Sequence, residues 1–326
     1  MEQREKNVIP PMSTFYGAPA CPNFDELSAD VAFLGVPFDQ GGYLRSPAGQ
    51  KWGPKAFRDL RKAYNYSGPE YSSKAGGEKA GGWFDINTNE WKLSGVSMVD
   101  CGDVNILPTQ GEKNCDTITE VVKRIVARDT LLVSIGGDHT ITFPVVRAFG
   151  RYNPLDIVHL DAHLDFGDSM EGVKIYNASC IRRCSELPFV RNITQIGFRG
   201  HTVNSVTKGS HDAAMKYGCN IITAKQFRQM GISRVVESIP QAENLYVTLD
   251  VDVFDPSIVP ATPAHAPGGL SYWEVEETLA GVAKKGKVVG CDIVCLIPDR
   301  DPSGIASRVA VDIIIDFLSA VFPSKK

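Results

Sequence analysis

Short apolar runs alternate along the chain with stretches in which apolar residues recur every three or four positions. A continuous apolar run of about four to eight residues is typical of a strand buried on both faces, and the longer spacing is typical of an amphipathic helix. The predicted strands are residues 30–36, 96–104, 131–136, 156–160, 192–198, 220–223, 245–252 and 287–295. The predicted helices are residues 55–63, 116–128, 140–149, 209–217, 271–283 and 304–321, with further helical segments up to residue 239.

The alternation of strands and helices predicts a mainly parallel sheet covered by helices on both faces. In such sheets the functional site lies at the carboxyl ends of the strands. No internal repeat and no linker interrupts the pattern, so we expect residues 1–326 to form a single domain. We expect residues 1–28 to form an arm over the domain surface or over a neighbouring subunit. We expect residues 64–94 to form irregular surface structure. Residues 166–191 predict a long connection, which is usually functional in a compact domain.

Composition and charge exclude several classes of protein. Hydrophobic residues make up 43% of the chain and charged residues 22%, which is typical of a globular protein. The formal net charge is −4 and no basic block is present, which argues against a nucleic-acid partner. No apolar run reaches the length of about 18 residues that a membrane span needs, and residues 1–6 are too charged for a signal peptide. We therefore expect a cytoplasmic protein whose eight cysteines are reduced thiols.

Three of the predicted strands end in side chains that bind divalent metals. In chain order these are His139, then Asp161, His163 and Asp165, then Asp250 and Asp252. Alternate residues of an extended chain share a face, so the middle three converge on one side. Burying four carboxylates together is costly without cations, and imidazole with carboxylate suits divalent first-row metals. The six residues therefore predict a site for two metal ions, and the alternative is that they line separate solvated loops.

These motifs resemble those of a known family, the ureohydrolases, which include arginase, agmatinase and guanidinobutyrase. The resemblance covers residues 30–318 and rests on Gly-Gly-Asp-His at 136–139, Asp-Ala-His-Leu-Asp at 161–165 and Asp-Val-Asp-Val-Phe-Asp-Pro at 250–256. It is strongest to the agmatinase-like branch. It implies a three-layer α/β/α sandwich and a centre of two divalent metal ions per chain, with Mn²⁺ expected first and Ni²⁺ second.

The resemblance also implies a role for each ligand. His139, Asp161, Asp165 and Asp250 would hold one ion, and Asp161, His163, Asp250 and Asp252 would hold the other. Two metal ions about 3.5–4 Å apart can share a water and lower its pKa from ~15.7 toward neutrality. The bridging hydroxide would attack an sp² carbon bonded to nitrogen, and Asp165 is the predicted catalytic carboxylate that orients it and passes a proton to the leaving amine. The expected reaction is hydrolysis of a C–N bond in a linear guanidino or amidino compound, with release of urea or a related product.

Two positions depart from the family pattern. Most members have a proton-shuttling His in a His-Gly-Thr triplet, whereas the aligned residue here is Asn177, which does not titrate near neutral pH. Members also have a Glu that pairs with the substrate guanidinium, whereas this chain has Cys295, which cannot form a bidentate carboxylate pair. His265, in a proline-rich loop, is a third candidate for substrate binding, with a solvated loop histidine as the alternative. We therefore predict an intact metal centre with an altered substrate shell.

The leading hypothesis is a metal-dependent hydrolase of a small guanidino or amidino compound, such as agmatine, free guanidine, a biguanide or a formimino compound. The runner-up is a non-catalytic, metal-binding subunit that supports an active paralogue in a hetero-oligomer. Asn177 and Cys295 motivate the runner-up, and the retention of all six predicted ligands opposes it. A third and weaker hypothesis is a metal hydrolase of the deacetylase type. We expect a homo-oligomer, a trimer or a hexamer, with neither nucleic acid nor membrane as a partner.

Overall fold

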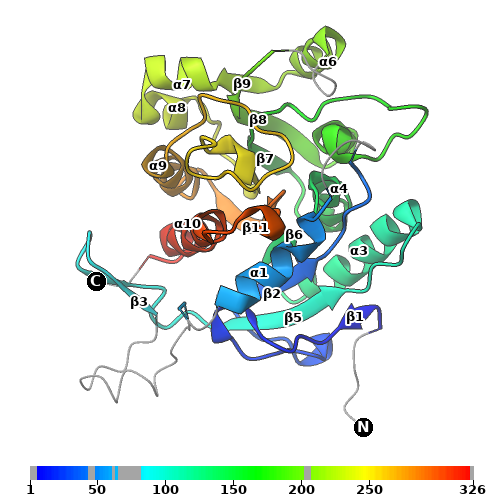
Figure 1. Cartoon of the computed structure of the whole chain (residues 1–326), viewed down its shortest axis with the longest axis vertical. Coiled ribbons are helices and arrows are strands. Elements are labelled where there is room, and N and C mark those ends of the chain that lie inside the picture. The colour runs from blue at the N-terminus through cyan, green and yellow to red at the C-terminus, as the bar shows by residue number, and fades with distance from the viewer. Residues whose placement is uncertain (1–5, 43–47, 61–62, 65–81, 202–206, 324–326) are drawn as a thin grey trace.

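The computed structural model describes residues 6–42, 48–60, 63–64, 82–201 and 207–323 (Figure 1). The strands are β1 Val8–Ile9, β2 Val31–Val36, β3 Trp83–Asp85, β4 Glu90–Lys92, β5 Met98–Val104, β6 Leu131–Gly136, β7 Leu155–Leu160, β8 Val190–Phe198, β9 Asn220–Thr223, β10 Asn244–Asp250 and β11 Lys287–Val294. The α-helices are α1 Gly53–Asp59, α3 Gly111–Val126, α4 Thr142–Val146, α5 Cys180–Ser185, α6 Lys208–Tyr217, α7 Ala224–Met230, α8 Ile232–Ser238, α9 Tyr272–Val282 and α10 Ile305–Val321. Short 3₁₀ helices are η1 Phe15–Gly17, η2 Phe24–Glu26, η3 Gln50–Trp52, η5 His139–Ile141, η6 Arg147–Phe149, η7 Asn177–Ser179, η8 Val251–Val253 and η9 Pro298–Arg300.

Within these residues, one nine-stranded sheet has the strand order β1-β5-β2-β6-β11-β10-β7-β8-β9. Neighbouring strands are parallel except at one edge, where β1 pairs antiparallel with β5. Helices α1, α10, α9, α8 and α7 pack in succession on one face, and α3, α4 and α5 pack on the other (Figure 1). The predicted α/β/α sandwich with a mainly parallel sheet is confirmed.

Burial on both faces explains why the strands are apolar without alternation. Every residue of β2, β6 and β7 is buried, because a helical layer covers each face of the sheet. The covering helices are apolar on one side only. In α3, for example, Ile118, Val122 and Ile125 recur at helical spacing and are buried, whereas the opposite side carries charged residues.

The predicted boundaries are mostly right, with three corrections. The N-terminal segment is part of the chain's own core rather than a surface arm, because β1 extends the sheet and Phe15 and Phe24 are buried. Its residues 1–5 lie outside the described residues. The stretch predicted to be irregular contains the hairpin of β3 and β4, while its residues 65–81 also lie outside them. The single helix predicted at 140–149 is divided into η5, α4 and η6.

Helix α1 is attached to the sheet and to the N-terminal segment by one arginine. Arg58 is buried, and its guanidinium donates to both carboxylate oxygens of Asp100 at 2.9 and 3.0 Å. It also donates to Asp103 at 2.6 Å and lies 3.9 Å from the ring centre of Phe15. Two carboxylates and an aromatic face therefore surround this cation at the junction of three segments.

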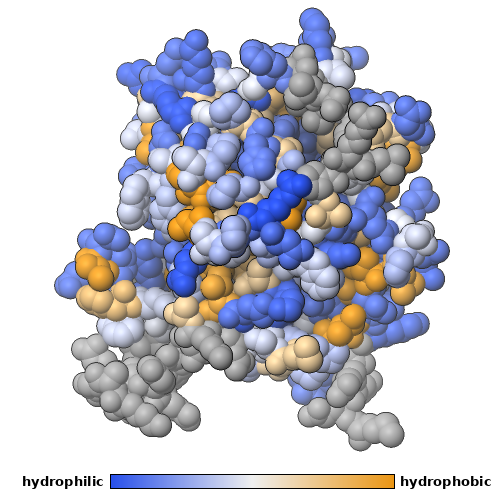
Figure 2. All heavy atoms as spheres, in the orientation of Figure 1, coloured by the Kyte–Doolittle hydropathy of each residue, from blue (hydrophilic) through white to orange (hydrophobic). Residues whose placement is uncertain are grey.

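The surface is mixed. The face in Figure 2 is mostly hydrophilic, with hydrophobic residues in small separate groups. None of the helices in the described part of the chain is long and apolar enough to cross a membrane.

Candidate metal centre

Four neighbouring strands of the sheet, β6, β11, β10 and β7, bring the candidate site together at their carboxyl ends. His139 follows β6, Cys295 follows β11, Asp250 ends β10, and Asp161 follows β7. Ligand atoms gather there in three overlapping groups, within each of which all of them lie within 4.8 Å of one another. The groups are His139, His159, Asp161 and Asp165; His139, Asp250 and Cys295; and Asp161, His163 and Asp252. All six predicted ligands are therefore together, and two further residues join them.

The turn after β6 positions His139. A Cβ on Gly137 would lie 2.3 Å from the carbonyl oxygen of Phe38, so only glycine allows the two chain segments to approach this closely. Asp138 is the N-cap of η5, and it accepts hydrogen bonds from the backbone N–H of Thr140 and of Gly41. Burial raises the pKa of Asp138 to about 6, although these bonds oppose the rise. Asp138 therefore supports the turn and belongs to none of the three ligand groups of described residues.

A row of buried polar residues crosses the sheet directly beneath the ligands. Register pairs Ser134 of β6 with Asp292 of β11, Asp292 with Thr248 of β10, Thr248 with His159 of β7, and His159 with Gln195 of β8. All five side chains are buried. We call Ser134, Asp292, Thr248, His159 and Gln195 the polar row. Its members were missed in the sequence because each lies within an otherwise apolar strand.

One half of the polar row fixes the tautomer of His139. The Thr248 hydroxyl donates to Asp292 at 2.6 Å, so its oxygen accepts from Nε2–H of His139 at 3.0 Å. The hydroxyls of Tyr246 and Thr142 also donate to Asp292, and these bonds oppose the burial that raises the pKa of its carboxyl. With its hydrogen on Nε2, neutral His139 has a bare lone pair on Nδ1.

That lone pair points into the carboxylates. Nδ1 of His139 lies 3.0 Å from Asp161 Oδ2, 3.0 Å from Asp165 Oδ2 and 3.3 Å from Asp250 Oδ2. The nitrogen is buried, and none of these contacts has the alignment of a hydrogen bond. A lone pair surrounded by three carboxylate oxygens is repelled unless a proton or a metal cation lies between them. This arrangement fits a divalent metal ion, and it is the strongest sign of one in the described residues.

The other half of the polar row orients Asp161. The amide of Gln195 donates to the carbonyl oxygen of Leu164 at 2.6 Å and to Nδ1 of His159 at 3.0 Å. His159 therefore carries its hydrogen on Nε2 and donates it to Asp161 Oδ2 at 2.8 Å. A histidine that donates to a ligand carboxylate fixes its direction, which is a common support of metal sites.

Asp165 has an unusual backbone. Its φ of 46° lies in the left-handed region, and its carbonyl accepts from the backbone N–H of Ile181 and of Arg182 at the start of α5. The Sγ of Cys180 lies 3.6 Å from Asp165 Oδ2. Strained backbone that the surroundings hold in place is frequent at functional sites. The long connection predicted at residues 166–191 is thus partly helical, and the start of α5 within it hydrogen-bonds to the backbone of Asp165.

The second carboxylate pair comes from the end of β10. Asp250 accepts from the backbone N–H of Asp252, and Asp252 accepts from that of Ala162, so each has one oxygen occupied by the backbone. The other oxygen of Asp252 lies 3.1 Å from Nδ1 of His163, which is also 3.2 Å from Asp161 Oδ1. His163 therefore lies between two carboxylates, and its Nδ1 hydrogen-bonds to that of Asp161.

Proton affinities in the cluster reflect its crowding. Burial and the neighbouring carboxylates raise the pKa of Asp250 and of Asp252. Burial also acts to raise the pKa of Asp161, but its histidine neighbours outweigh burial and hold that pKa well below the usual range. Burial lowers the pKa of His139 and of His163, and the surrounding acidic groups outweigh it and raise both well above the usual range. The carboxylates therefore hold positive charge among them, which is the electrostatic condition for binding cations.

The three predicted substrate-binding residues have different surroundings. Cys295 is buried beside Asp250. Asn177 begins η7, and its backbone N–H donates to the carbonyl of Gly41, close to the turn that carries His139. His265 is exposed and pairs with the carbonyl oxygen of Pro260 in its own loop at 2.6 Å, so the structure does not bring it to the ligands.

Arg199, which directly follows β8, supports the loop after β10, and no sequence motif indicated this role. Its guanidinium donates to the backbone carbonyls of Asp252, Phe254 and Ala266 through Nη2, and to that of Val253 through Nη1. Burial lowers its pKa. One side chain therefore ties the loop after β10 to the end of β8.

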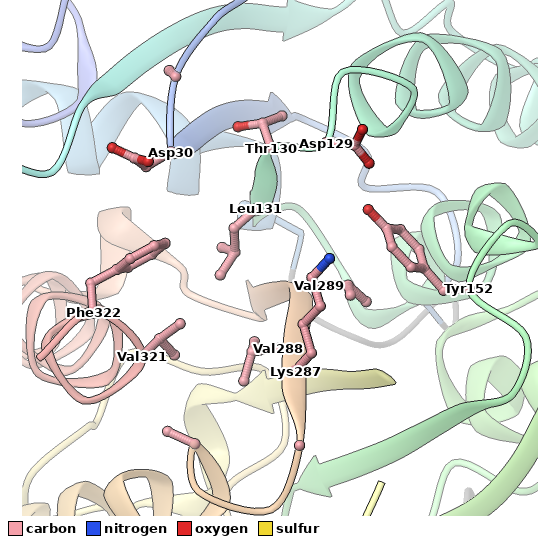
Figure 3. A pocket seen from close by; sticks show the side chains of 13 residues that line it. Asp30, Asp129, Thr130, Leu131, Tyr152, Lys287, Val288, Val289, Val321 and Phe322 are labelled. Atoms are coloured by element: carbon pink, nitrogen blue, oxygen red, sulfur yellow. The ribbon is translucent and has the colours of Figure 1, made fainter. Parts of the chain in front are cut away.

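A cavity of about 340 Å³ is separate from this site. It lies at the amino ends of β2, β6 and β11, and Asp30, Leu131, Lys287 and Phe322 line it (Figure 3). The candidate ligands are at the opposite ends of the same strands, so the cavity takes no part in their chemistry.

Comparisons with known proteins agree with this geometry. Proclavaminate amidinohydrolase of Streptomyces clavuligerus is 30% identical, over 98% of this chain and 96% of that protein. Its solved structure has a TM-score of 0.76, with 97% of this chain and 99% of that chain covered. The mitochondrial agmatinase of Gallus gallus is 29% identical, over 91% of this chain and 82% of that protein. A solved structure of Trypanosoma cruzi formiminoglutamase with Mn²⁺ shares the fold, with a TM-score of 0.77, 20% identity, and coverage of 96% of this chain and 99% of that chain.

The sequence profile of the arginase family matches residues 29–319, which span all the candidate ligands and eight of the nine strands of the sheet. This match covers far more than half of the chain. The protein therefore belongs to the arginase family.

Proposed function

We propose that this protein hydrolyses a C–N bond of a small guanidino or amidino compound and that it works with two divalent metal ions. The bare Nδ1 of His139 among three carboxylate oxygens carries the proposal. The family match supports it, as do the relatives named as amidinohydrolase and agmatinase. Mn²⁺ is the first candidate, because the similar structure of Trypanosoma cruzi formiminoglutamase contains it, and Ni²⁺ is the alternative.

In this proposal the ligands divide as the family resemblance implies. His139, Asp161, Asp165 and Asp250 would hold one ion, and Asp161, His163, Asp250 and Asp252 would hold the other. When bound, two such ions lower the pKa of a water toward neutrality and supply positive charge where oxyanion charge develops.

The chain's own residues do the remaining work. Asp165 is the proposed catalytic carboxylate, because its left-handed backbone and the bonds from α5 fix its side chain in the cluster. It would accept the proton of the attacking water and return it to the leaving nitrogen. The polar row keeps His139 in the required tautomer and Asp161 in the required direction. Arg199 holds the loop after β10 in place. Rigid support of this kind reduces the reorganisation that catalysis would otherwise need.

Two positions depart from the substrate shell that the family resemblance implies. Cys295 lacks the carboxylate that would pair with a guanidinium, and Asn177 lacks a group that titrates near neutral pH. We therefore propose a substrate that does not depend on that carboxylate pair, such as free guanidine, a biguanide or a formimino compound. Recognition would then come from groups other than the guanidinium-binding Glu of the family.

The same two positions favour one alternative function. A metal-binding subunit without its own activity would keep the six ligands but not the family's shuttle His and guanidinium-binding Glu, whose positions hold Asn177 and Cys295 here. In that case the chain would assemble with an active paralogue. For the hydrolase itself we propose a homo-oligomer, a trimer or a hexamer.

Metal content and product release test the proposal together. The purified protein would be loaded with Mn²⁺ or Ni²⁺, and bound metal would be counted by mass spectrometry. Urea and ammonia would then be measured with agmatine, arginine, 4-guanidinobutyrate, guanidine, a biguanide and formiminoglutamate. We expect about two ions per chain and turnover of one of these compounds. The Asp252→Asn variant should lose metal, whereas Asp212→Asn, on exposed α6, should not.

Two results would count against the hydrolase. Protein that binds no metal after loading would overturn the metal centre. Protein with two ions but no turnover, recovered together with a related chain that is active, would favour the supporting subunit. Light scattering of the same samples reports the oligomer.

A further inference from the structure

Cys295 is one of the clustered candidate ligands rather than a neighbour of them. Its Sγ belongs to a group in which this sulfur, a ring nitrogen of His139 and an oxygen of Asp250 all lie within 4.8 Å of one another. The thiol is buried and lies next to the Asp250 carboxylate. Three ligand types, nitrogen, oxygen and sulfur, therefore face one point from three neighbouring strands.

The backbone at Cys295 shows that this position is constrained. Its φ is 69°, in the left-handed region that residues with a Cβ rarely adopt. The backbone N–H of Cys295 donates to the carbonyl of Gly137 at 2.9 Å, and that of Ile297 donates to the carbonyl of Ala261 at 2.8 Å. Strain of this kind persists where the surroundings over-determine it, typically at ligand sites. Here it turns the side chain at the end of β11 toward Asp250.

A second observation points to a ligand at the same place. The Nδ1 of His139 is buried and has no hydrogen-bond partner, although three carboxylate oxygens lie within 3.3 Å. His139 shares its group with Cys295 and Asp250. A cation that satisfies this nitrogen therefore has the sulfur within reach.

We propose that Cys295 Sγ is a direct ligand of the metal ion held by His139 and Asp250. This inference rests on the proposed two-metal function and adds to it a sulfur ligand, which the resemblance does not imply. On binding, the S–H bond breaks, the proton leaves to solvent, and the sulfur donates an electron pair to the metal ion. The residue at the position of the family's guanidinium-binding Glu thereby becomes part of the metal centre.

A sulfur ligand makes the two metal positions unequal. Thiolates favour softer ions such as Zn²⁺ and Fe²⁺, whereas carboxylates and imidazole accept Mn²⁺ readily. The position of Asp161, His163 and Asp252 offers only oxygen and nitrogen. We therefore expect a mixed centre, with a softer metal beside Cys295 and Mn²⁺ or Ni²⁺ at the other position.

The chain offers matched controls for this sulfur. Cys180 Sγ lies 3.6 Å from Asp165 Oδ2, so it is the other thiol near the cluster, but it belongs to none of the three ligand groups of described residues. Cys291 is buried on the same strand as Cys295, four residues earlier, and faces no candidate ligand in those groups. Serine variants of both keep the fold's volume and remove one thiol each.

The experiment reads the metal–sulfur bond directly. The whole protein would be loaded with Zn²⁺ and, separately, with Co²⁺, and metal content would be counted first. X-ray absorption of the Zn²⁺ form should show a sulfur scatterer at about 2.3 Å. The Co²⁺ form should show the near-ultraviolet charge-transfer band of a cobalt–thiolate bond. Cys295→Ser should remove both signals and weaken Co²⁺ binding by at least about tenfold, whereas Cys291→Ser and Cys180→Ser should keep them.

The outcomes separate this inference from the function it rests on. Two bound ions without a sulfur scatterer in the wild-type protein would overturn the sulfur ligand and leave the two-metal centre standing. Signals that persist in Cys295→Ser and disappear in Cys180→Ser would also overturn it. Failure to bind any metal would overturn the proposed centre and the sulfur ligand together. The wild-type absorption spectrum decides the matter even if Cys295→Ser does not fold.

Discussion

At the residue scale, His139 shows how a side chain outside the cluster determines what a ligand can do. Its bare Nδ1 exists because Thr248 accepts the Nε2 hydrogen, and Thr248 can accept because it gives its own hydrogen to Asp292. Removing the hydroxyl would free His139 to turn or to adopt the other tautomer. We therefore expect the affinity for metal at this position to depend on a threonine that is outside the candidate ligand groups.

Thr248→Val is the corresponding prediction. We expect metal affinity to fall about 10–100-fold and the free energy of unfolding to fall by about 1–3 kcal/mol, because Asp292 loses a buried donor. Competition with a chelator measures the affinity, and urea unfolding measures the stability. Thr278→Val is the matched control, since Thr278 is equally buried but bonds only to the carbonyl of Glu274 in its own helix. Equal metal affinity in the two variants would contradict the role of Thr248.

Asn177→His tests the missing proton shuttle. Once a substrate is known, we expect kcat to rise by up to about 100-fold. The rate should increase as pH rises through ~6.5, because the neutral imidazole is the form that accepts a proton. A pH–rate profile of the variant measures this, with Asn87→His on the exposed hairpin as the control. An unchanged profile would mean that position 177 does not reach the reacting groups.

The convergence of the candidate ligands was easier to predict from the sequence than the residues that support them. His139, Asp161 and Asp250 follow strand ends, where parallel sheets place functional groups, so their convergence could be argued from the pattern. His159 was missed, although it precedes Asp161 by two residues and so shares its face of the strand. Thr248 and its partners could not be found this way, because they meet only through the register between strands that are distant in the chain.

At the element scale, helix α1 shows the difference between a buried and an exposed ion pair. Arg58 is buried with Asp100 and Asp103, whereas Lys55 on the same helix pairs with Asp59 in solvent. The N–H groups of the buried guanidinium donate to carboxylate oxygens, and its face lies against an aromatic ring. The exposed pair is screened by water and contributes little.

Arg58→Ala should lower the free energy of unfolding by about 3–5 kcal/mol, because it leaves Asp100 buried without its partner. Lys55→Ala should change it by less than about 0.5 kcal/mol. Urea unfolding of the two variants and the wild-type protein makes the comparison within one helix. Similar losses in both variants would show that the helix itself, not the buried pair, determines the effect.

Elements with a strong pattern were predicted well. The apolar run of β2 and the helical spacing of α10 gave boundaries within about two residues, the usual uncertainty of helix and strand ends. The hairpin of β3 and β4 was missed because its strands have three residues each, too few to show a period. Phe15 and Phe24 were read as parts of a surface arm because a segment without periodicity gives no sign of which face it buries.

At the scale of the whole molecule, ionisation of the buried thiols makes the free energy of unfolding depend on pH. Each of the eight cysteines is buried. Burial raises the pKa of Cys115 and of Cys219 to about 12, while an unfolded chain ionises its thiols near pH ~8.5. The folded state therefore keeps protons that the unfolded state releases. The contribution of these thiols to stability is complete below pH ~8.5 and is lost as the pH rises toward 12.

We accordingly expect the free energy of unfolding to fall above pH ~8.5 by about 1.4 kcal/mol per pH unit for each such thiol. Urea unfolding at pH 8, 9 and 10 in the presence of a reductant measures the slope. In Cys219→Ala the slope should be smaller by the share of one thiol. A slope identical to that of the wild-type protein would show that Cys219 ionises as easily in the folded state as in the unfolded one.

The place of β11 has a consequence for how a cell makes this protein. β11 is the last strand in the chain, yet it lies between β6 and β10 in the middle of the sheet. Until a ribosome has released residue 294, the strands already made can form only two blocks, β1-β5-β2-β6 and β10-β7-β8-β9, each with a bare edge. Unpaired strand edges can hydrogen-bond to other chains. We therefore expect the nascent protein to depend on chaperones to prevent aggregation through most of its synthesis. A truncated mRNA that ends before β11 would therefore yield a chain with two aggregation-prone blocks of strands rather than a smaller functional protein.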